Sequence, residues 1–195
     1  MKNRLLVLAL LGASLTTPAF AQGQQPQAPP TTSAFLRNMY NGNKNNIVRS
    51  AEKVPEDLYG LRPGPQEEVR TFGQHLAHVA NYNYLWCAQA KGEKNPNAAV
   101  NFEKTLKTKA EFQKVLTDSF AYCDPVYASL NDENGAQVVE IQQENGRVTR
   151  NTRMALLMLN VAHNNELYGN LVTTMRIKSI VPPSSEPRPA QGGRQ

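Results

Sequence analysis

The feature that most constrains the fold is the spacing of apolar residues in two long segments, residues 69–90 and 149–177. In both segments apolar side chains recur at steps of three and four, which places them on one face of an α-helix. Pro182 and Pro183 follow the second segment and predict its end. The stripes are Val69, Phe72, Leu76, Val79, Asn83 and Trp86 in the first segment, and Leu156, Leu159, His163, Leu167, Leu171 and Thr174 in the second.

Two further helices are predicted over residues 33–53 and 109–130. The first has a polar, Asn-rich middle, and the second contains Pro125, which predicts a kink or a first-turn proline. Residues 138–148 contain an Asn-Gly dipeptide, which favours a tight hairpin turn, so we expect a small two-stranded hairpin or an ordered loop there. The predicted fold class is all-α, a four-helix bundle with one longer connection between its third and fourth helices.

The N-terminal residues have the pattern of a secretory signal peptide. Lys2 and Arg4 precede a short apolar run, and Ala19 and Ala21 are the small residues of a cleavage site. The apolar run is shorter than the roughly 20 residues that cross a bilayer, so no stable membrane insertion is expected. We therefore expect residues 1–21 to be a signal peptide and the protein to be exported, to the periplasm or the extracellular space.

Composition divides the remainder of the chain. Residues 22–33 are rich in Gln, Pro and Thr, and residues 182–195 are rich in Pro, Ser and Gly, so both are expected to be disordered. The bundle is expected over residues 34–181. Loss of the signal peptide would lower the net charge from +5 to +3. The remaining positive charge is small, and the sequence has no run of basic residues interleaved with aromatic residues. No nucleic-acid partner is therefore expected.

The chain has two cysteines, Cys87 and Cys123. In an oxidising compartment such a pair favours a disulfide, and two buried free thiols are the alternative. Neither cysteine lies in a C-x-x-C spacing, so a zinc site built on cysteine is not expected.

The three histidines are the candidates for chemistry. His75 and His78 are three residues apart and share part of one helix face, while Glu166 lies almost one turn after His163. In helical bundles, histidines and carboxylates on facing helices form metal sites, and this donor set suits Zn²⁺, Fe²⁺ or Ni²⁺. A core histidine bonded to a backbone carbonyl, and a solvated Glu166, are the alternatives.

Residues 71–81 (TFGQHLAHVAN) resemble the second helix of DinB-like proteins, a family of metal-binding four-helix bundles. Residues 163–170 (HNNELYGN) resemble the fourth helix of the same family, and the resemblance extends over about residues 38–183. The family's usual site is three histidines, one from the second helix and two, four residues apart, from the fourth.

Carried over residue by residue, the resemblance implies that His78 and His163 are metal ligands. Leu167 occupies the position of the third histidine, and leucine cannot coordinate a metal. Glu166 would complete a set of two histidines and one carboxylate, or His75 would substitute for the missing ligand. Alternatively the site is degenerate and holds metal weakly or not at all.

The resemblance leaves three functions open. The first is a divalent-metal protein, with Zn, Ni or Fe, that carries out metal-assisted hydrolysis with Glu166 as ligand or general base. The second is a non-catalytic or stress-related bundle that binds a small molecule at a degenerate, metal-free site. The third is a metal-dependent thiol transferase, which export disfavours because reduced low-molecular-weight thiols belong to the cytoplasm. A homodimer formed through exposed helix faces is a further alternative.

Overall fold

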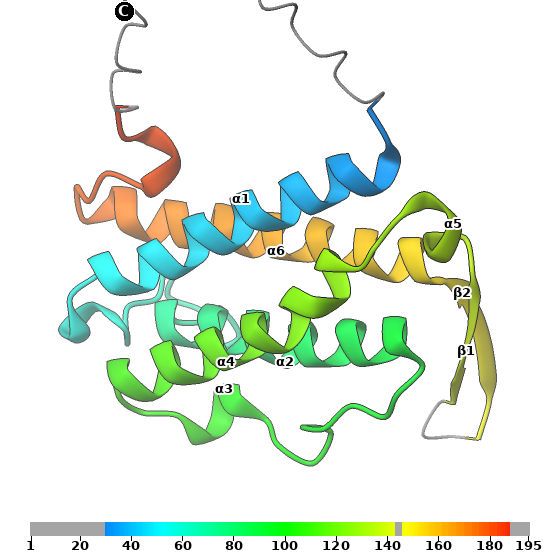
Figure 1. Cartoon of the computed structure of the whole chain (residues 1–195). Coiled ribbons are helices and arrows are strands. Elements are labelled where there is room, and N and C mark those ends of the chain that lie inside the picture. Colours follow the sequence, from blue (N-terminus) through cyan, green and yellow to red (C-terminus); the bar gives the residue numbers. More distant parts are fainter. Residues whose placement is uncertain (1–29, 143–145, 188–195) are drawn as a thin grey trace, which may run out of the picture.

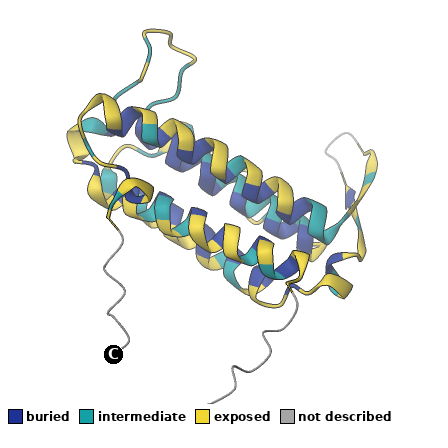
Figure 2. Cartoon of the chain, turned by 90° about the horizontal axis from the view of Figure 1, so that it is seen from above, coloured by how far each residue is buried: buried dark blue, intermediate teal, exposed yellow. Residues whose placement is uncertain are grey.

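The computed structural model describes residues 30–142 and 146–187, which form a bundle of four long helices (Figure 1). These helices lie side by side around one hydrophobic core, so the predicted all-α bundle is confirmed. Seen from above, their buried faces turn toward one another (Figure 2). The long helices are α1 (Thr32–Lys53), α2 (Phe72–Lys91), α4 (Lys109–Ala128) and α6 (Arg153–Ile177).

Each long helix begins at a capping residue. The Thr71 side chain accepts from the backbone N–H of Gln74, which starts α2 three residues later than the apolar pattern predicted. Thr152 caps α6 in the same way by accepting from the N–H of Ala155. The prediction that the fourth helix begins at residue 149 is therefore wrong, because the preceding residues pair as a strand.

That strand belongs to the hairpin expected in the long connection. Strands β1 (Val138–Gln142) and β2 (Val148–Thr152) pair antiparallel, with Val138 opposite Thr152. Of the two alternatives, the hairpin is confirmed. Gly146 has a φ of 79°, a left-handed conformation that suits glycine, while the Asn of the predicted turn lies outside the described residues.

Within residues 30–142 and 146–187, four short elements join or follow the long helices, and none was predicted. They are η1 (Glu56–Leu58), α3 (Phe102–Thr105), α5 (Asp132–Gly135) and η2 (Pro183–Ser185). The last packs on α1, where Glu186 forms ion pairs with Arg49 and Lys53. The folded part thus extends beyond residues 34–181 at both ends. The predicted signal peptide, residues 1–21, lies outside the described residues.

A disulfide joins Cys87 of α2 to Cys123 of α4, with 5.5 Å between their Cα atoms, as predicted. The contacts between long helices run from α1 to α4, α4 to α2, α2 to α6 and α6 to α1. The α2–α6 contact is therefore on the opposite side of the bundle from the α1–α4 contact. No helix in the described ranges is long and apolar enough to span a bilayer.

Candidate functional site

Two of the predicted ligands meet where α2 packs against α6. The ring centroids of His78 and His163 lie 4.9 Å apart, with an angle of 37° between the ring planes. Both side chains are only partly buried, so solvent reaches the pair. The fold thus brings together two histidines that are far apart in the sequence, and we call them the histidine pair.

An aromatic row on α2 continues from His78 at intervals of one helical turn. The centroid of the Tyr82 ring lies 4.6 Å from those of both His78 and His163. Trp86, the single tryptophan of the chain, stands edge-on to His163 at 4.9 Å. The two aromatic side chains thus shield one flank of His163 and form an apolar wall beside the histidine pair.

A carboxylate that was not among the predicted site residues contacts the histidine pair. Oε1 of Glu103, on α3, lies 2.5 Å from Nδ1 of His78, and its Oε2 accepts from Nε of Arg70 at 2.6 Å. In the sequence around Glu103, the only local signal is Asn101, a residue type that begins helices, followed by Phe102 and Glu103. That signal predicts a helix start and says nothing of a contact with a residue 25 positions earlier.

Charge in the site follows from burial and these contacts. Burial alone would raise the pKa of Glu103, but the hydrogen bonds from His78 and Arg70 lower it to about 2. Burial, helped by the charge of His78, lowers the pKa of His163 to about 4, although the Asn164 side chain acts in the opposite direction. At neutral pH Glu103 is therefore ionised and His163 is neutral.

Beneath His163 lies a buried polar network. The amide nitrogens of Asn160 and Asn164 both donate to Oδ1 of Asn83 at 2.9 Å, which fixes the rotation of α6 against α2. Asn83 in turn donates to Ser119 of α4. Nδ1 of His163 and Oδ1 of Asn164 are buried and have no hydrogen-bond partner among the described residues.

The other predicted site residues lie elsewhere. Glu166 is exposed, and Leu167 is buried in the core with 3% of its surface exposed. His75 is also buried, and its Nδ1 lies 3.0 Å from the carbonyl oxygen of Thr71, as in an ordinary core histidine. Within the described ranges, no three His, Cys, Asp or Glu side chains converge to hold a metal. The predicted set of two histidines and Glu166 is therefore not assembled, and His75 does not substitute.

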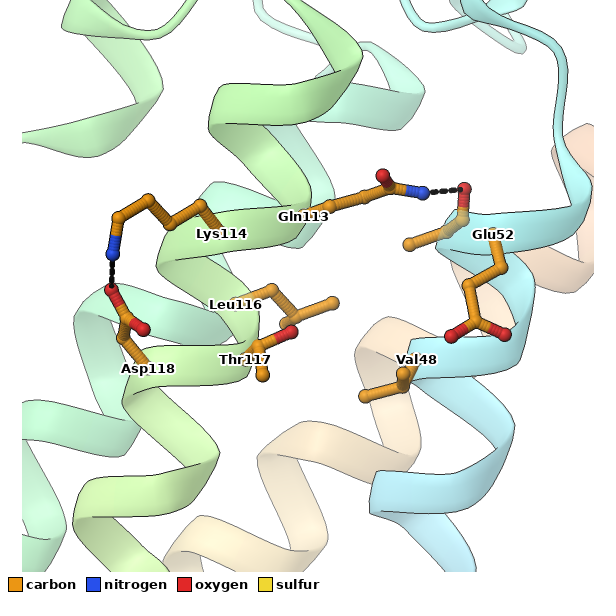
Figure 3. A pocket seen from close by; sticks show the side chains of 8 residues that line it. Val48, Glu52, Gln113, Lys114, Leu116, Thr117 and Asp118 are labelled. Carbon is orange, nitrogen blue, oxygen red and sulfur yellow. Dashed lines mark hydrogen bonds and ion pairs between the residues drawn. The ribbon is translucent and has the colours of Figure 1, made fainter.

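The opposite side of the bundle has a groove of about 330 Å³ between α1 and α4 (Figure 3). Val48 and Leu116 face each other across it, and the Gln113 amide bridges its end by donating to the carbonyl of Ala51 at 3.1 Å. Lys114 turns away from the groove and forms an ion pair with Asp118, one turn further along α4. No histidine lines this groove, so it is separate from the histidine pair.

Comparison with solved structures shows which known folds the bundle is similar to. A conserved protein from Enterococcus faecalis has a TM-score of 0.57 at 11% identity, with 76% of this chain and 98% of that chain covered. A DinB-like protein, YjoA, from Bacillus subtilis has a TM-score of 0.57 at 20% identity, with 80% and 99% covered. A mycothiol-dependent maleylpyruvate isomerase has a TM-score of 0.53 at 16% identity, and this chain spans 60% of its length and is itself covered over 71%.

At these identities the likeness shows the fold alone. No curated protein matches the chain. The sequence model of the DinB superfamily matches residues 39–166, which is more than half of the chain. This chain therefore belongs to the DinB superfamily.

Proposed function

We propose that this protein is an exported member of the DinB superfamily that binds one divalent metal ion, Zn, Ni or Fe, through His78 and His163. The remaining coordination positions would be open to water and a small-molecule ligand. The observation that carries the proposal is the approach of the two rings to 4.9 Å, at the positions that the family resemblance implies for metal ligands.

The residues fit a two-histidine site. With metal–nitrogen distances of about 2.1 Å, two imidazoles on one tetrahedral ion have ring centroids roughly 5 Å apart, close to the separation observed. His163 is neutral at pH 7, so one of its ring nitrogens has a free lone pair. The residues do not fit a three-ligand site, since Leu167 is buried and Glu166 is exposed. We therefore expect weak, exchangeable binding.

The surrounding residues have separable roles in this proposal. A bound divalent ion would supply Lewis acidity toward a ligand at the open positions, which is the basis of metal-assisted hydrolysis. Tyr82 and Trp86 exclude water from one flank of the pair and offer flat apolar surfaces to a ligand. Glu166 is exposed and is not proposed as ligand or general base.

A second candidate function is a metal-free bundle that binds a small molecule beside the same histidines. One observation favours it: Leu167 places an apolar side chain at the third-ligand position. A thiol transferase is the weaker alternative, although one structural neighbour is named as a mycothiol-dependent enzyme. The Cys87–Cys123 disulfide suits an oxidising compartment, where reduced thiols are scarce.

Thermal unfolding of chelator-treated protein with added Zn²⁺ or Ni²⁺ tests the proposal. A metal that binds the folded state raises the unfolding temperature by mass action. We expect this rise in the wild type and in the exposed-site control Glu166→Gln, and its loss in His78→Ala and His163→Ala. A rise that persists in both histidine variants, or no rise in the wild type, would count against metal binding by the pair.

A further inference from the structure

The contact between α3 and α2 gives His78 a carboxylate partner on the edge of its ring that bears Nδ1. The distance from Nδ1 to Oε1 of Glu103 is 2.5 Å, and the two side chains are 12% and 18% exposed. An ionised carboxylate only accepts hydrogen bonds, so the proton between them belongs to Nδ1 of His78. When the imidazole is neutral, its Nε2 therefore carries the free lone pair.

Glu103 is itself held in place. Nε of Arg70 donates to its second oxygen at 2.6 Å, and this cation favours the charged carboxylate. The short helix α3 is fixed by its Asn101 N-cap and by the backbone N–H of Phe102, which donates to Oδ1 of Asn81 at 3.4 Å. The carboxylate thus has a fixed direction before any ligand arrives.

We propose that Glu103 is the positioning residue of the site: it keeps the proton of His78 on Nδ1 and presents Nε2 for coordination. Histidines that bind metals typically donate their other ring N–H to a carboxylate or carbonyl, which fixes the ring and strengthens the ligand. The effect on metal affinity rests on the proposed function, whereas the effect on the tautomer does not.

The ¹⁵N chemical shifts of the imidazoles report which nitrogen carries the proton. The chain has three histidines, so a long-range ¹H–¹⁵N spectrum at a pH where they are neutral can be assigned with His75→Gln and His163→Gln. We expect His78 protonated on Nδ1 in the wild type and in Glu166→Gln. In Glu103→Ala, the fraction protonated on Nδ1 should fall, and most of the proton should move to Nε2.

Glu103→Gln removes the charge with little change in shape, and it gives a second reading if the alanine variant does not fold. It should also lower the fraction of His78 protonated on Nδ1. An unchanged tautomer in both variants would overturn the proposal.

Zinc titration of the same samples tests the consequence for binding. Loss of an outer carboxylate partner lowers metal affinity by about 10- to 100-fold, so we expect this loss in Glu103→Ala and no loss in Glu166→Gln. If the wild type binds no zinc, the proposed function fails. The tautomer of His78 in the ¹⁵N spectra still shows whether Glu103 positions its proton. Equal zinc affinity in the wild type and Glu103→Ala would overturn the role of Glu103 in metal binding.

Discussion

His163 should make the stability of the protein depend on pH in mildly acidic solution. Burial lowers its pKa in the folded state from 6.5 to about 4, so the unfolded chain binds a proton that the folded chain does not. Stability linked to His163 is therefore fully present above pH 6.5 and is lost as the pH falls toward 4. The fall of this pKa from 6.5 to about 4 corresponds to at most about 3 kcal/mol, at about 1.4 kcal/mol per pH unit, and solvent screening of the partly exposed ring should reduce the loss to about 1–2 kcal/mol.

The variant His163→Leu removes the titrating group while keeping an apolar side chain of comparable reach. Urea unfolding, followed by circular dichroism, should be measured for the wild type and the variant between pH 7 and pH 4.5. Glu103 is present in both proteins, and its contribution to stability is lost only as the pH falls below about 4.5, its pKa in the unfolded chain, toward about 2. We expect the wild type to lose about 1–2 kcal/mol more than the variant by pH 4.5.

The emission of Trp86 provides a local check, since its ring lies 4.9 Å from that of His163. Protonation of His163 should quench this emission in the folded protein, with a midpoint near the lowered pKa. Parallel pH dependence of the unfolding free energy in the wild type and His163→Leu would show that His163 does not make stability depend on pH. Such a result would mean that His163 is solvated in solution rather than held neutral by burial.

Three further results are expected. The double variant Cys87→Ala/Cys123→Ala should lose about 4 kcal/mol of stability in urea unfolding, because the disulfide closes a loop of sequence separation 36; no loss would mean that the bond does not form in solution. Gly73→Ala should lower the free energy of unfolding by about 1–3 kcal/mol, since its Cβ would lie 2.8 Å from the Phe112 ring. Gly169→Ala, with open space around the new Cβ, should raise the free energy of unfolding by about 0.5–1 kcal/mol. Equal effects of the two variants on thermal unfolding would contradict this packing. N-terminal sequencing of the protein from a secreting host should find cleavage after Ala21, and an intact N-terminus would contradict export.

The four long helices were predictable because apolar residues recur in them at the helical period, and most of these residues are buried in the bundle. Leu159 is an exception, because it was placed on the apolar stripe of the fourth helix and is 49% exposed. The ends of these helices were less predictable from the sequence. The start of α6 depends on the Thr152 cap and on the pairing of residues 148–152 with β1, which compete with helix formation. The hairpin itself was anticipated by its Asn-Gly dipeptide.

The site was predictable only in part. The resemblance placed His78 and His163 correctly on facing helices, and the structure brings their rings together. Whether Glu166 or Leu167 would turn inward depends on the rotation of α6, which Asn160 and Asn164 fix through bonds to α2. Neighbouring positions differ by about 100° around a helix, so the rotation of α6 decides which of the two side chains faces the core.

Glu103 could not be predicted, because its role arises from tertiary packing. It lies on a four-residue helix within a connection, and such a helix has no apolar period to identify its inward face. Its contact with His78 joins residues 25 positions apart and depends on how α3 packs on α2.

The metal content of the untagged mature protein shows whether His78 and His163 bind a metal ion. The protein should be stripped with a chelator and dialysed to equilibrium against saturating Zn²⁺, Ni²⁺ or Fe²⁺, and the metal bound in excess of the dialysate should be measured by elemental analysis. We expect about one ion per chain at saturating metal, lost in both His78→Ala and His163→Ala and retained in Glu166→Gln. Absence of metal in the reloaded wild type, or equal metal content in the histidine variants, would contradict metal binding by the two histidines.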